Sequence, residues 1–340
     1  MTDSSQRGAL PTSLVPAGVT PRVLAAIVVT ILLWASAFVV IRGTSEHFSG
    51  GALALARLLV GTAVLGLLMI GHRWVRPSGR QWTALILYGV AWFGAYNVAL
   101  NTAEQTLDAG TTAMLVNIGP ILIALGAGVF LREGIPKWLA IGAAVAFAGV
   151  VLIGIGSSMT PGVVTTELDA TGTVITDAAG NTGGGVDIVG VIWCLVAAVT
   201  YAVGVLVQKP LLRTLPASQV TWMGCAAGMI VCLPFTGELV GQIQEAPTSA
   251  VLGAIYLGAG PTALAFTTWA YALARVPAGQ LSISTYIVPP LVIVFGWVIF
   301  SEVPAPLAIA GGVLCLVGVA LSRRRARVVV PEPRHPAPTK

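Results

Sequence analysis

The sequence predicts an all-α polytopic membrane protein, with ten transmembrane helices arranged as two inverted repeats of five helices each. Three observations predict this fold class: the composition, the number of long apolar runs, and an internal repeat. Hydrophobic residues make up 56% of the 340 residues and charged residues only 9%, and the mean hydropathy is +0.89. Soluble domains carry roughly 25% charged residues because their surfaces face water. So little charge indicates an integral membrane protein.

Ten apolar runs are each long enough to form a membrane-spanning helix. A hydrocarbon core of roughly 30 Å needs about 20 apolar residues in helical conformation. Most connections between the runs are short, as expected for antiparallel neighbours. The expected spans are 22–43, 52–71, 82–103, 109–131, 136–155, 186–207, 218–236, 249–274, 279–301 and 304–322.

These spans divide the chain into five parts. The expected parts are an N-terminal tail (1–21), a first five-helix repeat (22–155), a polar loop (156–185), a second repeat (186–322) and a basic C-terminal tail (323–340). The loop is rich in Gly, Thr and Asp and contains no Lys or Arg. Its portion 169–181 is compatible with a small hairpin or with disorder.

The distribution of charge predicts the orientation in the cytoplasmic membrane. With the N-terminus inside, 16 of the 18 Lys and Arg residues fall on the cytoplasmic side, as the positive-inside rule requires. Both termini are therefore expected in the cytoplasm. The run Ala35–Ala37 resembles a signal-peptide cleavage site, but 21 residues precede the first apolar run, so we expect an uncleaved first helix.

The two halves of the chain align with each other. Because each half contains an odd number of spans, the second copy is expected to enter the membrane upside down. Inverted repeats are typical of alternating-access transporters, whose solute binds between the halves near the midplane. At an offset of 169 residues the matches are Ala109-Gly110 with Ala278-Gly279, Pro120 with Pro289, Glu133 with Glu302, Gly142 with Gly311, and Gly149 with Gly318. Near the start of each half the offset is 167, which matches Trp34 with Tyr201 and Arg42 with Lys209.

Several short motifs, in this order and partly duplicated, resemble the EamA family of the drug/metabolite transporter superfamily. The resemblance covers about 22–322 and implies a carrier of small metabolites, commonly an exporter of amino acids or related compounds and often driven by an ion gradient. It does not identify the solute. The motifs are Leu33–Phe38, Ala56–Leu59, Pro120, Leu131–Glu133, Ser284–Pro290, Ser301–Pro304 and the paired glycines at 142, 149, 311 and 318.

The leading functional hypothesis is a secondary transporter that exports a small metabolite by alternating access. An uptake carrier for metabolites or drugs, a passive channel and a membrane scaffold are the alternatives. The chain has no GxxxxGK[ST] or HExxH sequence and no paired intramembrane aspartates, so an enzyme is not expected. No cofactor, metal ion or nucleic acid is expected to bind, and the partners are the solute, the lipid bilayer and, by the resemblance, a coupling ion. The oligomeric state is not predicted.

Arg57 is the one basic residue well inside an expected span. Arginine at the centre of a membrane helix costs roughly 2.5–3.5 kcal/mol on insertion scales. One interpretation is structural: its side chain reaches the external surface or pairs with Glu46 or Glu104. The other is an anchor for a solute carboxylate, which is favoured by Gly224 standing at the equivalent position of the second half.

Polar and aromatic residues on other spans complete the expected solute site. Trp92, Tyr96 and Asn97 share the helix expected at 82–103, where they suit either a cavity or helix packing. Asn117 and Tyr286 each stand three residues before a proline, and such interruptions often border a transport pathway. The expected solute-binding residues are Trp34, Arg57, Trp92, Tyr96, Asn97, Asn117, Tyr201, Trp269, Thr285 and Tyr286.

A second set of residues is expected to act in coupling or gating. Glu133 and Glu302 stand just before helices, where a carboxylate is favoured by free N–H groups and the helix dipole. Glu104 and Asp108, near an outer helix end, are the candidates for proton coupling. The full set is Glu104, Asp108, Glu133, Glu302, Pro120, Pro289 and Pro290.

Overall fold

The computed structural model describes residues 20–71, 74–130, 137–159, 188–276, 281, 284–301, 304 and 306–322. Within these residues every regular element is a helix and none is a strand. The all-helical class is therefore confirmed for the described part of the chain. Residues 1–19, the loop region 160–187, the C-terminal tail 323–340, Glu133 and Glu302 lie outside it.

Among the described residues, six helical stretches are long and apolar enough to cross a membrane. Three are continuous α-helices: α1 (Pro21–Thr44), α2 (Gly50–Met69) and α8 (Ile188–Leu211). The other three are composite. They are α3 (Gly79–Tyr88), η1 (Gly89–Ala95) and α4 (Tyr96–Ala103); α9 (Ala217–Cys232), η2 (Leu233–Phe235) and α10 (Thr236–Glu245); and α11 (Thr248–Leu257), η3 (Gly258–Leu264) and α12 (Ala265–Leu273).

Further apolar helices in the described part overlap the remaining expected spans. They are α5 (Ala109–Val116), α6 (Gly119–Phe130), α7 (Lys137–Met159), η4 (Thr285–Ile287), α14 (Val288–Phe300) and α15 (Pro306–Ser322). The chain is thus a multi-pass helical membrane protein, while the number of ten crossings and the inverted relation of the halves stay predictions.

Several helices extend beyond their expected ends, among them α8, which continues to Leu211 and not only to 207. Helix α7 continues to Met159, into the segment expected as a polar loop. The seventh expected span ends at 236, but α10 continues to Glu245. This helix is amphipathic: Leu239 is buried, while Gln242 accepts a hydrogen bond of 2.9 Å from the backbone N–H of Ser49 at the start of α2. A prediction based on hydropathy alone ends the span before such an amphipathic helix.

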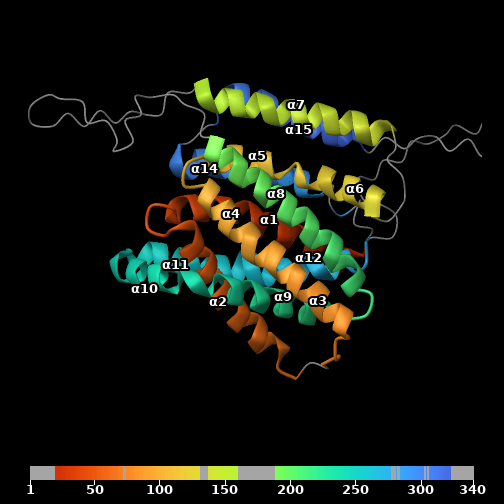
Figure 1. Ribbon diagram of the computed structural model, residues 1–340. Coiled ribbons are helices and arrows are strands. Elements are labelled where there is room, and N and C mark those ends of the chain that lie inside the picture. Colours follow the sequence, from red (N-terminus) through yellow and green to blue (C-terminus); the bar gives the residue numbers. More distant parts are fainter. Residues whose placement is uncertain are drawn as a thin grey trace, which may run out of the picture.

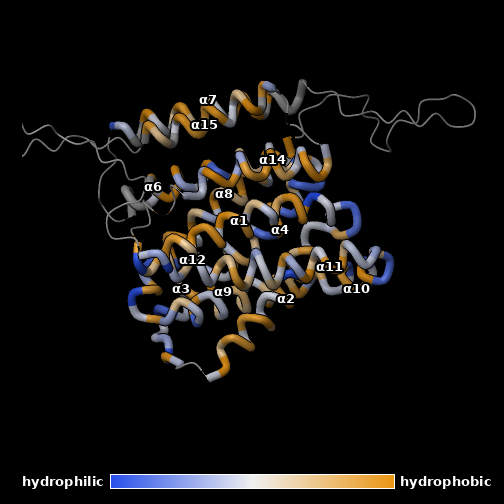
Figure 2. Tube along the Cα trace, turned by 180° about the vertical axis from the view of Figure 1, so that it is seen from behind, coloured by the Kyte–Doolittle hydropathy of each residue, from blue (hydrophilic) through white to orange (hydrophobic). Residues whose placement is uncertain are grey.

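The helices form layers in which α7 and α15 lie side by side at one edge (Figure 1). Small residues allow this contact, because a Cβ atom on Gly149 would lie 2.6 Å from the carbonyl oxygen of Gly311. The Cys315 thiol also donates to the carbonyl of Ala146 at 3.2 Å. Hydrophobic residues follow the lengths of the helices, and hydrophilic ones gather at the two ends of the bundle (Figure 2).

Two π-helices, η1 and η3, occupy the middle of two composite spans. They begin at Gly89 and Gly258, 169 residues apart, which is the offset of the internal repeat. Helix η1 packs against α9 and η3 packs against α2. Pro261 in η3 has no N–H to donate, which favours a local change of helix pitch there.

Helix breaks also stand at matching places in the two halves. Helix α5 ends at Val116 and α6 begins at Gly119. In the second half the short 3₁₀-helix η4 precedes α14. Pro120 and Pro289 are the second residues of their helices, a position where the missing N–H costs nothing. Asn117 lies in the first break, and this exposes its side chain to the interior of the bundle.

Candidate functional site

A cavity of about 60 Å³ lies inside the helical body. Its wall comes from both sequence halves, through α1, α2, η1, α4, α5, α8, α12, η4 and α14. The lining residues are Trp34, Ala37, Phe38, Arg57, Trp92, Tyr96, Leu100, Ala113, Val116, Asn117, Tyr201, Phe266, Thr285, Val288 and Pro289. Segments that are distant in sequence therefore meet at this one space.

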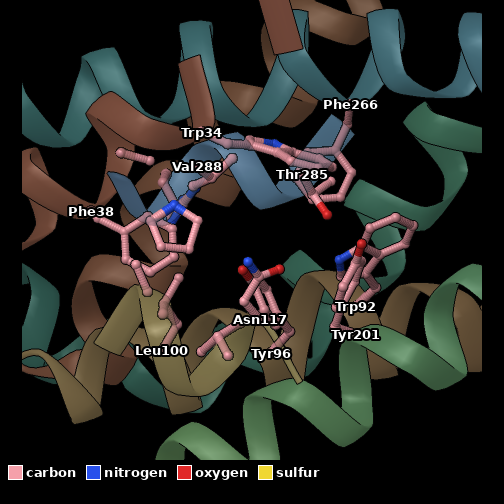
Figure 3. Close-up of a pocket in the computed structure, with 15 residues that line it drawn as sticks. Trp34, Phe38, Trp92, Tyr96, Leu100, Asn117, Tyr201, Phe266, Thr285 and Val288 are labelled. Carbon is pink, nitrogen blue, oxygen red and sulfur yellow. The ribbon is translucent and has the colours of Figure 1, made fainter. Parts of the chain in front are cut away.

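Aromatic rings form one continuous part of the wall. The ring of Trp92 lies 5.0 Å from that of Phe266 and 5.3 Å from that of Tyr201, measured between ring centroids. Trp34 lies 5.5 Å from Phe266. Figure 3 shows Trp34 and Phe266 along one side of the open space, with Trp92 and Tyr201 next to Phe266 along the adjoining side. Such a wall suits the apolar part of a small solute.

Arg57 supplies the positive charge of the wall. Its side chain is 3% exposed, so of the two structural alternatives the reach to the surface does not apply, while pairing with Glu104 stays open. Its Nε donates a hydrogen bond of 3.1 Å to Oγ1 of Thr262, in η3. Tyr96 and Glu104 interact with it electrostatically. Its Nη1 is buried and has no hydrogen-bond partner in the described part of the chain.

Asn117 brings an amide to the same space. It follows the last residue of α5, and its backbone N–H is bonded to the carbonyl of Ala113 at 3.2 Å. Its Nδ2 atom, like Nη1 of Arg57, is buried and lacks a hydrogen-bond partner among the described residues. Asn117 and Thr285 lie on opposite sides of the open space (Figure 3).

Three of the expected solute-binding residues lie outside the cavity wall. Asn97 is fully buried, and its Nδ2 donates to the carbonyl of Phe93 at 2.7 Å. Trp269 packs behind the wall, with its ring 5.0 Å from that of Trp34. Tyr286 packs against a small separate cluster that contains Ile121. The other seven residues of that set line the cavity.

The coupling and gating candidates are spread over several places. Glu104 is fully buried at the end of α4. Asp108 caps α5, where its carboxylate accepts a hydrogen bond of 2.8 Å from the N–H of Thr111. Pro289 lines the cavity, whereas Pro120 and Pro290 do not. Glu133 and Glu302 lie outside the described residues.

Seven apolar residues of the wall were not predicted from the sequence. Helical spacing contains some of this signal, because Phe38 follows Trp34 by one turn and Leu100 follows Tyr96 by one turn. Nothing in the sequence marks the others as different from ordinary core residues. The lining residues not selected are Ala37, Phe38, Leu100, Ala113, Val116, Phe266 and Val288.

Comparison with known families gives a match along both halves of the chain. The sequence model of the EamA-like transporter family matches residues 22–155 and again residues 188–324. A solved structure titled "Crystal structure of protein" resembles the chain with a TM-score of 0.58 at 19% identity. This alignment covers 90% of this chain and 97% of the other. The second likeness concerns the fold alone.

Two relatives of similar length carry transporter names. A protein of Streptantibioticus cattleyicolor named "Probable terminal-alkyne amino-acid exporter" is 33% identical over 88% of this chain and 93% of its own length. A protein of Bacillus subtilis named "Uncharacterized transporter YdfC" is 30% identical over 85% of this chain and 87% of its own length.

Proposed function

The chain belongs to the EamA-like transporter family, and we propose that it is a secondary transporter that exports an amino acid or a related small metabolite by alternating access. The observation that carries the proposal is the cavity whose wall is shared by the two halves of the chain. A solute held there contacts both halves, so a movement of one half against the other can change its access. Family and relatives indicate a transporter and not an enzyme.

The chemistry of the wall supports a small solute with an apolar part. Aromatic side chains of Trp34, Trp92, Tyr201 and Phe266 provide flat apolar surface, and Arg57 provides charge. The name of the Streptantibioticus relative adds amino acids as a solute class. In this proposal both termini lie in the cytoplasm, the side on which Lys and Arg collect.

Glu104 is the coupling residue that the proposal retains. It is buried and interacts electrostatically with Arg57, so a change in its charge alters the field at the cavity. Asp108 is less suited to this role, because helix capping uses its carboxylate. Replacing Glu104 with Gln is expected to leave exchange of solute intact but to abolish its stimulation by an imposed proton gradient.

Exchange in proteoliposomes tests the proposal. Vesicles containing purified protein are loaded with propargylglycine, a terminal-alkyne amino acid, and uptake of labelled propargylglycine is measured beside a mixture of the common amino acids. A carrier gives saturable uptake that internal solute accelerates. The control variant is Arg275→Gln, which neutralises an exposed arginine stacked on Tyr271 outside the cavity.

Each outcome separates the alternatives. Uptake that rises linearly with concentration indicates a passive channel, and no uptake of any amino acid contradicts the proposed solute class. Direction is measured in cells, by comparing the extracellular medium of an expressing strain with that of an empty-vector strain. Enrichment of an amino acid outside supports export, while its depletion indicates uptake.

A further inference from the structure

The cavity wall contains two buried nitrogen donors for which the described residues supply no acceptor: Nη1 of Arg57 and Nδ2 of Asn117. From them we infer that the cavity recognises the carboxylate of its solute, through Arg57 and Asn117 together, and that the amino group is not required for binding. The inference rests on the proposed function and specifies the chemical class of solute as monocarboxylates with an apolar tail.

The hydrogen bonds of Arg57 use one part of its guanidinium and leave another without an acceptor in the described part of the chain. Thr262 accepts the hydrogen bond of Nε, which fixes the plane of the group. Nη1 is left buried without an acceptor in the described part of the chain. A buried charged donor without a partner is costly, and a carboxylate is the acceptor whose two oxygens match guanidinium geometry best.

Asn117 adds a second donor of a different origin. Its side chain enters the cavity at the break between α5 and α6 and belongs to a different helix from Arg57. A carboxylate has only acceptor atoms, two of them, so two donors on one cavity satisfy both oxygens. A neutral amide ligand would present one acceptor and its own unmatched donors.

The wall offers no ionic partner for an ammonium group. Among the described lining residues Arg57 is charged and none is Asp or Glu. Glu104 interacts electrostatically with Arg57 but does not border the cavity. The remaining wall is aromatic and aliphatic, apart from Asn117, Thr285 and the tyrosine hydroxyls. Binding is therefore expected to depend on the carboxylate and the tail, and only weakly on the amine.

Three probes that share the same alkyne tail test the carboxylate and the amino group of the solute separately. Propargylglycine has both acid and amine, 4-pentynoate has only the acid, and 3-butyn-1-amine has only the amine. Each is measured by thermal stabilisation of the purified protein and by competition against propargylglycine exchange. The two acids are expected to bind with affinities within about fivefold of each other, and the amine about 10- to 100-fold more weakly, as expected for a lost hydrogen-bonded charge pair.

Two variants test the residues. Arg57→Gln and Asn117→Asp are each expected to weaken both acids about 10- to 100-fold. Asn117→Asp keeps the shape of the side chain and places a carboxylate in the wall of the same cavity as Arg57, so it repels a solute carboxylate without removing side-chain volume. Arg275→Gln, the exposed control, is expected to bind like the wild type.

The inference and the proposed function fail in different ways. If the wild type exchanges propargylglycine but the amine competes as well as 4-pentynoate, the carrier stands and the carboxylate inference is overturned. Unchanged acid binding in a folded Asn117→Asp protein overturns it as well. If the wild type neither exchanges nor binds any of the probes, the proposed amino-acid solute is itself contradicted.

Discussion

Two contacts in the molecule have the same construction but different chemistry. In one, α2 packs against η3; in the other, α9 packs against η1. Each joins a helix to a π-helix, and the two π-helices stand at the repeat offset. In each, a glycine begins the π-helix and lies against the partner backbone. A Cβ atom on Gly258 would lie 2.7 Å from the carbonyl oxygen of Arg57, and one on Gly89 would lie 2.5 Å from that of Gly224.

The side chains at these contacts differ between the halves. In the α2–η3 contact Arg57 donates to Thr262. At the equivalent positions of the α9–η1 contact stand Gly224 and Phe93, and Phe93 is fully buried among aromatic rings. The first contact holds a charge at the cavity, whereas the second is closed by apolar packing. The two copies of this contact therefore differ in chemistry: one carries a buried charge at the cavity, and the other contributes apolar packing alone.

The largest effect on stability and transport is expected from replacing Gly89 and Gly258, the glycines of these two contacts, with alanine. Gly89→Ala and Gly258→Ala each force a methyl group against a backbone carbonyl, which costs about 1–3 kcal/mol of stability in a packed interior. Because the two contacts have the same construction, we expect both variants to lose stability and transport to a similar extent. Thermal unfolding of purified protein and propargylglycine exchange measure this.

The control is Gly237→Ala in α10, where an added Cβ atom meets nothing within 4 Å. It is expected to leave stability unchanged or raised by about 0.4–1 kcal/mol. A Gly258→Ala protein as stable as the wild type would show that the two contacts do not share their construction.

An intermediate effect is expected from Thr262, which we treat as a positioning residue for Arg57. Thr262→Val keeps the shape but removes the acceptor of the Nε hydrogen bond. Polar contacts within membrane proteins average about 0.6 kcal/mol and reach about 1.7, so the KM for propargylglycine is expected to rise about three- to tenfold with little change in maximal rate. The kinetics of exchange measure the two constants separately.

Thr262→Ser separates positioning from packing, because it restores the hydroxyl but removes a methyl group. That methyl group packs against Gly61: a Cβ atom added to Gly61 would lie 2.8 Å from it. Rescue of the KM by Ser but not by Val supports positioning. Equal defects in both variants would assign Thr262 to packing alone.

The helices of the fold were predictable because the hydropathy of a helix can be read from its own stretch of sequence. Apolar runs gave the helices of the described part, and the repeat offset paired Trp34 with Tyr201, both of which line the cavity. Helix α10 was not expected as a helix, because an amphipathic surface segment resembles a loop when only hydropathy is considered.

The partners of the site residues were not predictable from the sequence. Thr262 lies 205 residues from Arg57, and nothing local marks it as the acceptor in preference to Glu46 or Glu104. The π-helices likewise depend on packing against α2 and α9. Asn97 and Asn117 are the same residue type, yet Asn97 bonds within its own helix while the break after α5 turns Asn117 to the cavity. Only the arrangement of the helices distinguishes the two.

The smallest effect on transport is expected at Phe93, the counterpart of Thr262. Phe93→Leu keeps an apolar side chain of similar size, and its ring contacts with Tyr88 and Phe266, at 5.5 and 4.5 Å between centroids, are lost. Such a swap costs less than about 1.5 kcal/mol of stability. Because Phe93 is not among the residues that line the cavity, the KM for propargylglycine is expected to stay within about twofold of wild type. A KM change as large as that of Thr262→Val would mean that the apolar α9–η1 contact also shapes the solute site. The proposed difference in role between the two contacts would then be wrong.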